Sequence, residues 1–207
     1  MLPCILFLKN IYKPLFIKTF FPLSERGKNS NLTFMIVLYI ILGIIAFVLI
    51  AGLLIPKGMT ATREIIINKP ESEVFNYIKY LKNQQNYSKW ATLDPNMKNE
   101  FSGTDGMPGF INSWEGNKKV GKGAQEIIAV NPGRLDTELR FEKPFKSVAK
   151  SFMTTEASGE HATKVKWGFV GAMNYPMNAM KLFMNMEKAI GNDFSTGLEK
   201  LKVLLEK

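Results

Sequence analysis

The chain has 207 residues, a formal net charge of +9 and one cysteine. Its length accommodates one domain of ordinary size plus an appendage, and a lone cysteine excludes an internal disulfide and a thiolate metal site. Only four of the 27 basic residues are arginines. Because nucleic-acid recognition favours arginine, the lysine excess points to an anionic membrane surface and not to nucleic acid.

Residues 1–33 mix aromatic residues with lysines, contain Cys4 and are interrupted by three prolines. One interpretation is a basic segment that lies on a membrane surface. The other, which we favour, is a leader that is not translated, with translation starting at Met35.

The segment Phe34–Ile55, FMIVLYIILGIIAFVLIAGLLI, has 22 residues without a charge, Asn or Gln. As a helix it is ~33 Å long, enough to cross a hydrocarbon core of ~30 Å. A buried core helix would keep a polar stripe, and a cleaved signal peptide would have a shorter apolar region with small residues after it. We therefore predict an uncleaved, single-pass transmembrane helix over residues 34–55.

The side of the membrane on which the rest of the chain lies is undecided, because the basic residues near the two ends of this segment are balanced. They are Lys18, Arg26 and Lys28 before it and Lys57, Arg63 and Lys69 after it. A start at Met35 would remove the first group and favour a cytoplasmic domain.

The pattern of residues 57–207 predicts one α+β domain. A β-branched run, Thr62–Asn68, predicts a strand, and Pro70 begins a helical segment with acids in its first turn. From Glu100 to Gly171, glycine-containing turns separate short apolar-rich segments, which is typical of an antiparallel meander of about six strands.

The last segment, from about Pro176 to Leu205, is predicted to be a long amphipathic helix. Gly191 and Gly197 are unfavourable in a helix interior, so we expect a kink or a close approach near Gly191. Its apolar face comprises Phe183, Met186, Ile190, Phe194, Leu198, Leu201 and Leu205.

Residues 62–206 resemble the START-like (helix-grip, SRPBCC) superfamily, and within it the polyketide cyclase/dehydrase and lipid-transport branch. The resemblance rests on REIIINKPESEVFNYIKYLKNQQNYSKW, TKVKWGF and GLEKLKVLLEK. It implies a curved antiparallel sheet of about seven strands wrapped around the long C-terminal helix, with a hydrophobic cavity between sheet and helix.

This resemblance gives a role to the methionines, five of which lie between Met173 and Met186. Methionine is the most adaptable apolar side chain, so the group suits a lining that reshapes around variable ligands, although each one is equally well explained as core. The residues expected to bind the ligand are Trp90, Phe110, Trp114, Phe141, Trp167, Phe169, Met177, Met180, Phe183, Met184, Met186, Glu187, Ile190 and Phe194.

Candidates for catalysis are few. Glu187 falls on the apolar face of the last helix, where burial would raise its pKa and suit it to proton transfer or to holding a ligand head group. The alternative for Glu187 is an ion pair at the sheet edge. His161 lies in a turn by pattern, and no metal, nucleotide or hydrolase motif occurs, so we expect no metal and no cofactor.

The sequence thus favours a monomeric, membrane-anchored module that binds a hydrophobic small molecule or lipid and is not an enzyme. Two alternatives stay open. One is a cyclase-like enzyme acting on a hydrophobic substrate through Glu187, and the other is a protein-interaction module resembling the chaperone cofactors of the superfamily.

Overall fold

The structure, a computed structural model, describes residues 25–207. The chain divides into two units, Met1–Phe47 and Val48–Lys207. Most of the predicted leader, up to residue 24, lies outside the described residues, and with it Cys4.

The helix α1 (Glu25–Leu54) contains the predicted apolar segment. Its part from Ser30 to Leu54 is long and apolar enough to cross a membrane, and its large apolar side chains are exposed. A signal sequence near an N-terminus has the same properties. The helix itself is confirmed, and its insertion into a membrane remains a prediction.

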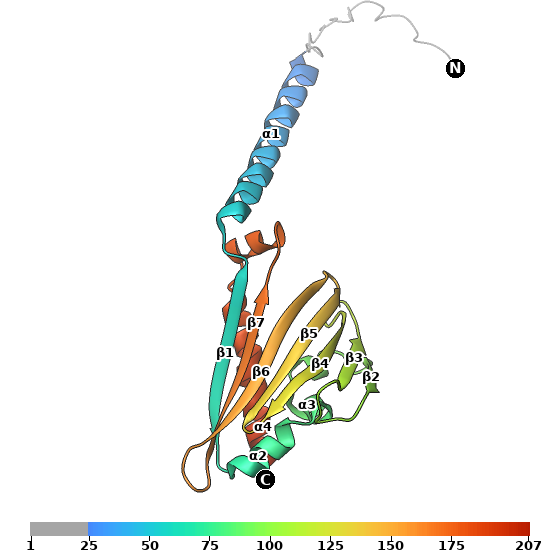
Figure 1. The fold of residues 1–207 in the computed structure, drawn as a ribbon. Coiled ribbons are helices and arrows are strands. Elements are labelled where there is room, and N and C mark those ends of the chain that lie inside the picture. The colour runs from blue at the N-terminus through green and yellow to red at the C-terminus, as the bar shows by residue number, and fades with distance from the viewer. Residues whose placement is uncertain (1–24) are drawn as a thin grey trace, which may run out of the picture. The chain divides into compact units, whose positions relative to one another are not determined.

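A seven-stranded antiparallel sheet forms the second unit (Figure 1), as predicted. Its strands are β1 (Gly58–Ile67), β2 (Lys98–Ser102), β3 (Ile111–Glu115), β4 (Lys122–Asn131), β5 (Arg134–Lys143), β6 (Ser147–Ala157) and β7 (Thr163–Ala172). The order is β1-β7-β6-β5-β4-β3-β2. Strands β2 to β7 therefore form the predicted meander, and β1 closes it by pairing with β7 along its whole length.

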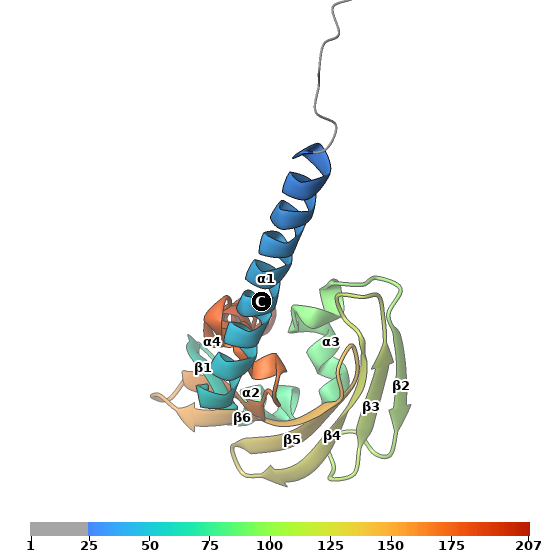
Figure 2. The same cartoon turned by 90° about the horizontal axis from the view of Figure 1, so that it is seen from above.

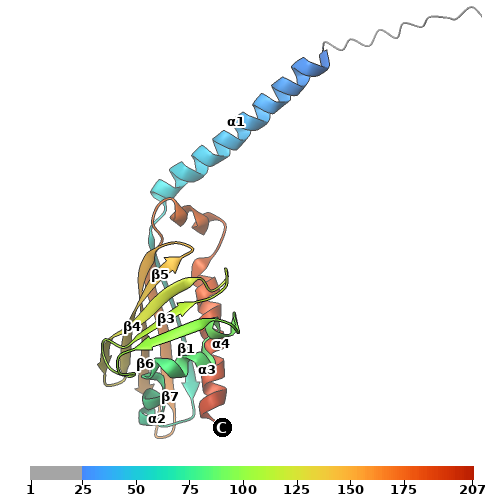
Figure 3. The same cartoon turned by 90° about the vertical axis from the view of Figure 1, so that its right-hand side faces the viewer.

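The helices of the second unit that follow α1 are short except for the last. They are α2 (Glu71–Ile78), η1 (Leu81–Asn83), α3 (Gln84–Tyr87), η2 (Trp90–Thr92), η3 (Met177–Leu182) and α4 (Met186–Leu205). The sheet curves around α2, α3 and α4, which lie on its concave side (Figures 2 and 3). A sheet and a helix with one apolar face each bury those faces against one another.

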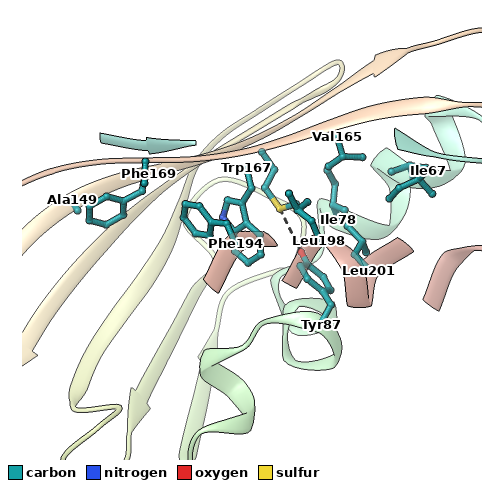
Figure 4. Packing of buried hydrophobic residues seen from close by; sticks show 13 residues of the cluster. Ile67, Ile78, Tyr87, Ala149, Val165, Trp167, Phe169, Phe194, Leu198 and Leu201 are labelled. Carbon is teal, nitrogen blue, oxygen red and sulfur yellow. Dashed lines mark hydrogen bonds between the residues drawn. The ribbon is translucent and has the colours of Figure 1, made fainter. Parts of the chain in front are cut away.

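The main core joins the sheet to α2, α3 and α4 (Figure 4). Trp167 on β7 stacks on Phe194 of α4, with ring centroids 4.7 Å apart, and meets Tyr87 edge-on at 5.7 Å. Tyr87 is buried and its hydroxyl donates a hydrogen bond to the Met153 sulfur at 3.5 Å. Burial raises the pKa of the Tyr87 phenol above its ordinary value.

The C-terminal helix is shorter than predicted. It begins at Met186 and not near Pro176, because the Asn185 side chain accepts a hydrogen bond from the Lys188 N–H and so forms a local N-cap. The preceding residues form the 3₁₀ helix η3 instead. Helical periodicity continues through this segment in the sequence, and for that reason the pattern did not reveal the break.

Close approach explains the two glycines of α4. The guanidinium of Arg63 occupies the space where a side chain at Gly191 would lie, and a Cβ at Gly197 would lie 2.8 Å from the Trp167 ring. The close approach expected near Gly191 is confirmed.

These two contacts predict different costs for the same substitution. Gly197→Ala forces the packed Trp167 indole to move and is expected to lower the free energy of unfolding by about 1–3 kcal/mol. Gly191→Ala gains about 1 kcal/mol of helix propensity but displaces the Arg63 guanidinium from its ion pair with Glu187. Because the two effects oppose one another, we expect almost no change in the free energy of unfolding. Thermal unfolding of the two full-length variants, followed by circular dichroism, distinguishes them, and equal melting temperatures would contradict this account.

Candidate ligand-binding cavity

A cavity of about 920 Å³ lies within the second unit, between the concave face of the sheet and the N-terminal half of α4. Volumes of about 300–1,000 Å³ are usual for small-molecule sites. Residues from all seven strands, α3, η2, η3 and the β5–β6 turn contribute to its wall. The cavity is therefore built by almost the whole domain.

Aromatic residues and methionines form most of the apolar wall. All three tryptophans of the chain, Trp90, Trp114 and Trp167, line the cavity. Trp114 meets Phe141 edge-on at 5.9 Å. The lining methionines are Met59, Met97, Met173, Met177, Met180 and Met186.

A row of uncharged polar side chains crosses the concave face of the sheet from β2 to β6. It comprises Asn99 on β2, Asn112 on β3, Gln125 on β4, Thr137 on β5 and Ser151 on β6, and all but Asn99 are buried. Asn99, Asn112, Gln125 and Ser151 line the cavity. Polar groups on a buried face are costly unless they are paired, so this row requires an explanation.

Hydrogen bonds satisfy one end of the row. Gln125 Nε2 donates to Thr137 Oγ1 at 3.2 Å, and Thr137 Oγ1 donates to the Ser151 carbonyl at 3.3 Å. The Ser151 hydroxyl donates to the Gly168 carbonyl at 3.0 Å and accepts from Trp167 Nε1 at 3.3 Å. At the other end, the side-chain oxygens of Asn99 and Asn112 are buried and have no hydrogen-bond partner among the described residues.

Charged residues of the lining lie at the end of β5 and in the β5–β6 turn. They are Glu142, Lys143 and Lys146, and all three are exposed. The buried part of the wall is uncharged. No group of three side chains suited to holding a metal ion occurs within the described part of the chain.

Comparison with known proteins identifies the fold. No protein-family model matches the chain, and no curated protein does. Among solved structures, norcoclaurine synthase from Thalictrum flavum, in complex with dopamine and hydroxybenzaldehyde, has a TM-score of 0.56 at 10% identity, covering 75% of this chain and 91% of that one. A hypothetical protein from Helicobacter pylori has a TM-score of 0.54 at 12% identity, covering 70% and 87%.

The fold is the Bet v1-like helix grip. The helix-grip fold predicted from the sequence is thereby confirmed. At these identities the likeness concerns the fold alone and carries no activity to this chain.

Ten of the predicted ligand-binding residues line the cavity between the sheet and α4. They are Trp90, Trp114, Phe141, Trp167, Phe169, Met177, Met180, Met186, Ile190 and Phe194. The structure thus brings together residues from η2 to α4 that are far apart in the sequence. Their contact with a ligand remains a prediction.

Phe110 lies outside the cavity. It is buried in a second cluster with Leu81, Ile127 and Leu135, and it stacks on Phe101 at 6.0 Å. Alternation puts Phe110 on the same face of the sheet as Trp114. Phe110 comes directly before β3, however, and at that end of the strand the second cluster fills the space. Its place is explained by core packing.

Phe183, Met184 and Glu187 also lie outside the cavity. Phe183 and Met184 precede the helix, which was predicted to extend through them, and Glu187 is held by an ion pair. Phe183 and Met184, between η3 and α4, are exposed. Glu187, in the first turn of α4, accepts a hydrogen bond at 2.6 Å from Nη1 of Arg63, which lies on β1. The ion pair at the sheet edge, the alternative for Glu187, is the observed arrangement.

Sequence reasoning missed the polar row of the helix grip. A signal was present, since Asn112 occupies an inward position between Phe110 and Trp114 in the alternation. A polar residue at such a position marks a cavity wall or a buried hydrogen bond. Asn112 and Gln125 are direct neighbours on β3 and β4, but this pairing is not visible without the register.

Proposed function

We propose that this chain is a membrane-anchored module that binds a hydrophobic small molecule or lipid in the cavity between the sheet and α4. The observation that carries the proposal is the cavity itself, which is of ligand size and lined by three tryptophans and six methionines. A fully packed domain would leave no such space. As the sequence resemblance implies, we assign the chain to the polyketide cyclase/dehydrase and lipid-transport branch.

Hydrogen bonds between η3 and the end of α1 support a link between cavity and membrane. Asn178, fully buried, donates through Nδ2 to the Gly52 carbonyl at 2.6 Å and the Ile55 carbonyl at 2.9 Å. Lys181 donates to the Pro56 carbonyl at 2.7 Å. The Gly52 carbonyl lies in the last turn of α1, and the Ile55 and Pro56 carbonyls follow it. Carbonyls at a helix C-terminus lack partners within the helix and need others.

The same segment contributes to the cavity. Met177 and Met180 of η3 line it, whereas Leu182, Phe183 and Met184 expose apolar side chains. If residues up to Leu54 span the bilayer, η3 lies at the membrane surface, where exposed apolar side chains are favourable. A hydrophobic ligand then has a short path between the bilayer and the cavity.

The two alternatives receive less support. The cyclase-like enzyme relied on Glu187, whose carboxylate pairs with Arg63 away from the cavity. The chaperone-cofactor-like module would be favoured by a filled core, and this domain has a cavity instead. No observation raises either above ligand binding.

The test uses the full-length protein in lipid nanodiscs and a terminally brominated long-chain alcohol, because bromine quenches tryptophan fluorescence on contact and every tryptophan lines the cavity. Saturable quenching is expected. Ala149→Phe, which puts a large ring into the cavity wall, should lower the affinity measured by quenching at least tenfold. Ala157→Phe, at the exposed end of the same strand, should not. Quenching that is absent, or equal in both variants, would overturn the proposal.

A second prediction concerns the methionines. Replacing Met177, Met180 and Met186 together with leucine should preserve the fold, because such swaps cost less than ~1.5 kcal/mol each. The range of brominated probe shapes that bind should become narrower, because a leucine side chain is stiffer than a methionine side chain. The exposed Met184→Leu variant is the matched control and should bind as the wild type does. An unchanged probe profile in the triple variant would indicate that these methionines are only core.

A further inference from the structure

The open end of the polar row carries information about the ligand. Asn112 is 5% exposed, lines the cavity, and its Oδ1 has no partner within the described part of the chain. Asn99, one strand away on the same wall, has the same unpartnered oxygen. A leucine at either position would avoid the free-energy cost of a buried, unpaired amide.

The row is asymmetric in a way that packing alone does not explain. At Thr137 and Ser151 each hydroxyl hydrogen has an acceptor in the protein. Asn99 and Asn112, by contrast, line the cavity while their side-chain oxygens have no hydrogen-bond partner in the described part of the chain. Two unpartnered amide oxygens on neighbouring strands of one ligand-sized space are what a site for a polar ligand group contains.

The charge of that group follows from its surroundings. The buried part of the cavity wall offers amides and hydroxyls but no cation, since Lys143 and Lys146 lie exposed at the rim. A carboxylate or phosphate beside Asn112 would lose its hydration without gaining a counter-charge. An uncharged hydroxyl, which both donates and accepts, matches a side-chain amide.

We propose that the ligand is an amphiphile whose uncharged hydrogen-bonding group, a hydroxyl or a primary amide, binds Asn112 and Asn99, with its apolar part against the tryptophans and methionines. This assignment rests on the proposed function and names its ligand class. A fatty-acid anion is excluded from the buried wall and binds only with its carboxylate at the lysine-bearing rim.

The experiment compares three brominated probes of equal chain length, an alcohol, an alkane and a fatty acid, by tryptophan quenching of the full-length protein in nanodiscs. The wild type is expected to bind the alcohol about tenfold more tightly than the alkane or the fatty acid. Asn112→Leu should reduce alcohol affinity about fivefold to tenfold, the effect of losing one buried hydrogen bond. Its alkane affinity should stay the same or rise.

Controls separate the possible failures. Asn192→Leu makes the same replacement at an exposed position of α4 outside the cavity and should leave all affinities unchanged. The melting temperature of Asn112→Leu should equal or exceed that of the wild type, which excludes unfolding as the cause. If all three probes bind equally, or Asn112→Leu weakens them equally, the ligand class is wrong while the proposed function stands. If no probe quenches, both fail.

Discussion

Replacing Trp167 with alanine is expected to lower the free energy of unfolding by about 3–5 kcal/mol. Trp167 is 3% exposed and connects β7 to three other elements, stacking on Phe194 and meeting Tyr87 and Trp90 edge-on. Its loss leaves a large void in the main core and removes the donor to Ser151. A change of this size is a large fraction of the stability of an ordinary domain, so the melting temperature should fall markedly.

Trp114 provides the comparison, because it also lines the cavity but is only partly buried and contacts one aromatic ring. Trp114→Ala should change stability much less, while enlarging the cavity and altering probe binding. Thermal unfolding and probe titration of both variants test this. Equal destabilisation by the two substitutions would mean that the wall at Trp114 is as tightly packed as the core.

Introducing arginines at Ile41 and Ile45 is expected to abolish stable membrane insertion. Both residues lie near the middle of the candidate span Ser30–Leu54. Each arginine at the centre of a membrane helix costs about 2.5–3.5 kcal/mol on insertion scales, so the pair costs about 6 kcal/mol. The wild type should stay in the membrane fraction after carbonate washing, and the double variant should leave it.

Leucines at the same two positions are the control, because they keep the helix apolar and should leave the protein carbonate-resistant. Intact mass measurement of the membrane-bound protein distinguishes an anchor from a signal sequence, since a signal sequence would be removed. Release of the wild type by carbonate, or cleavage after the apolar run, would contradict the proposed anchor.

The polar row affects both the stability of the domain and its proposed affinity for a ligand. An unpartnered buried amide at Asn112 destabilises the domain by about 1–3 kcal/mol relative to a well-packed apolar side chain. A domain that needed only a core would tolerate leucine there. Under the proposed function, a ligand that hydrogen-bonds Asn112 recovers this free energy on binding, which makes its affinity depend on its polar group.

Much of the fold was determined by local pattern. The alternation of Leu135, Thr137 and Leu139 specifies which face of β5 is inward, and the turn residues specify where strands end. A meander connects neighbours in sequence, so strand order follows from the chain order without long-range information. The run Phe34–Ile55 specifies a helix by its composition.

What only the tertiary structure decided depends on distances between elements. Periodicity put Glu187 and Phe183 on an apolar helix face, but the break at Asn185 and the arrival of Arg63 from β1 moved both to the surface. Likewise, alternation turned Asn112 inward, but only the register with Gln125 and Thr137 reveals a row with one satisfied and one open end. The physical reason is that a pattern specifies the direction of a side chain, whereas a cavity is the space that remains after every element has packed.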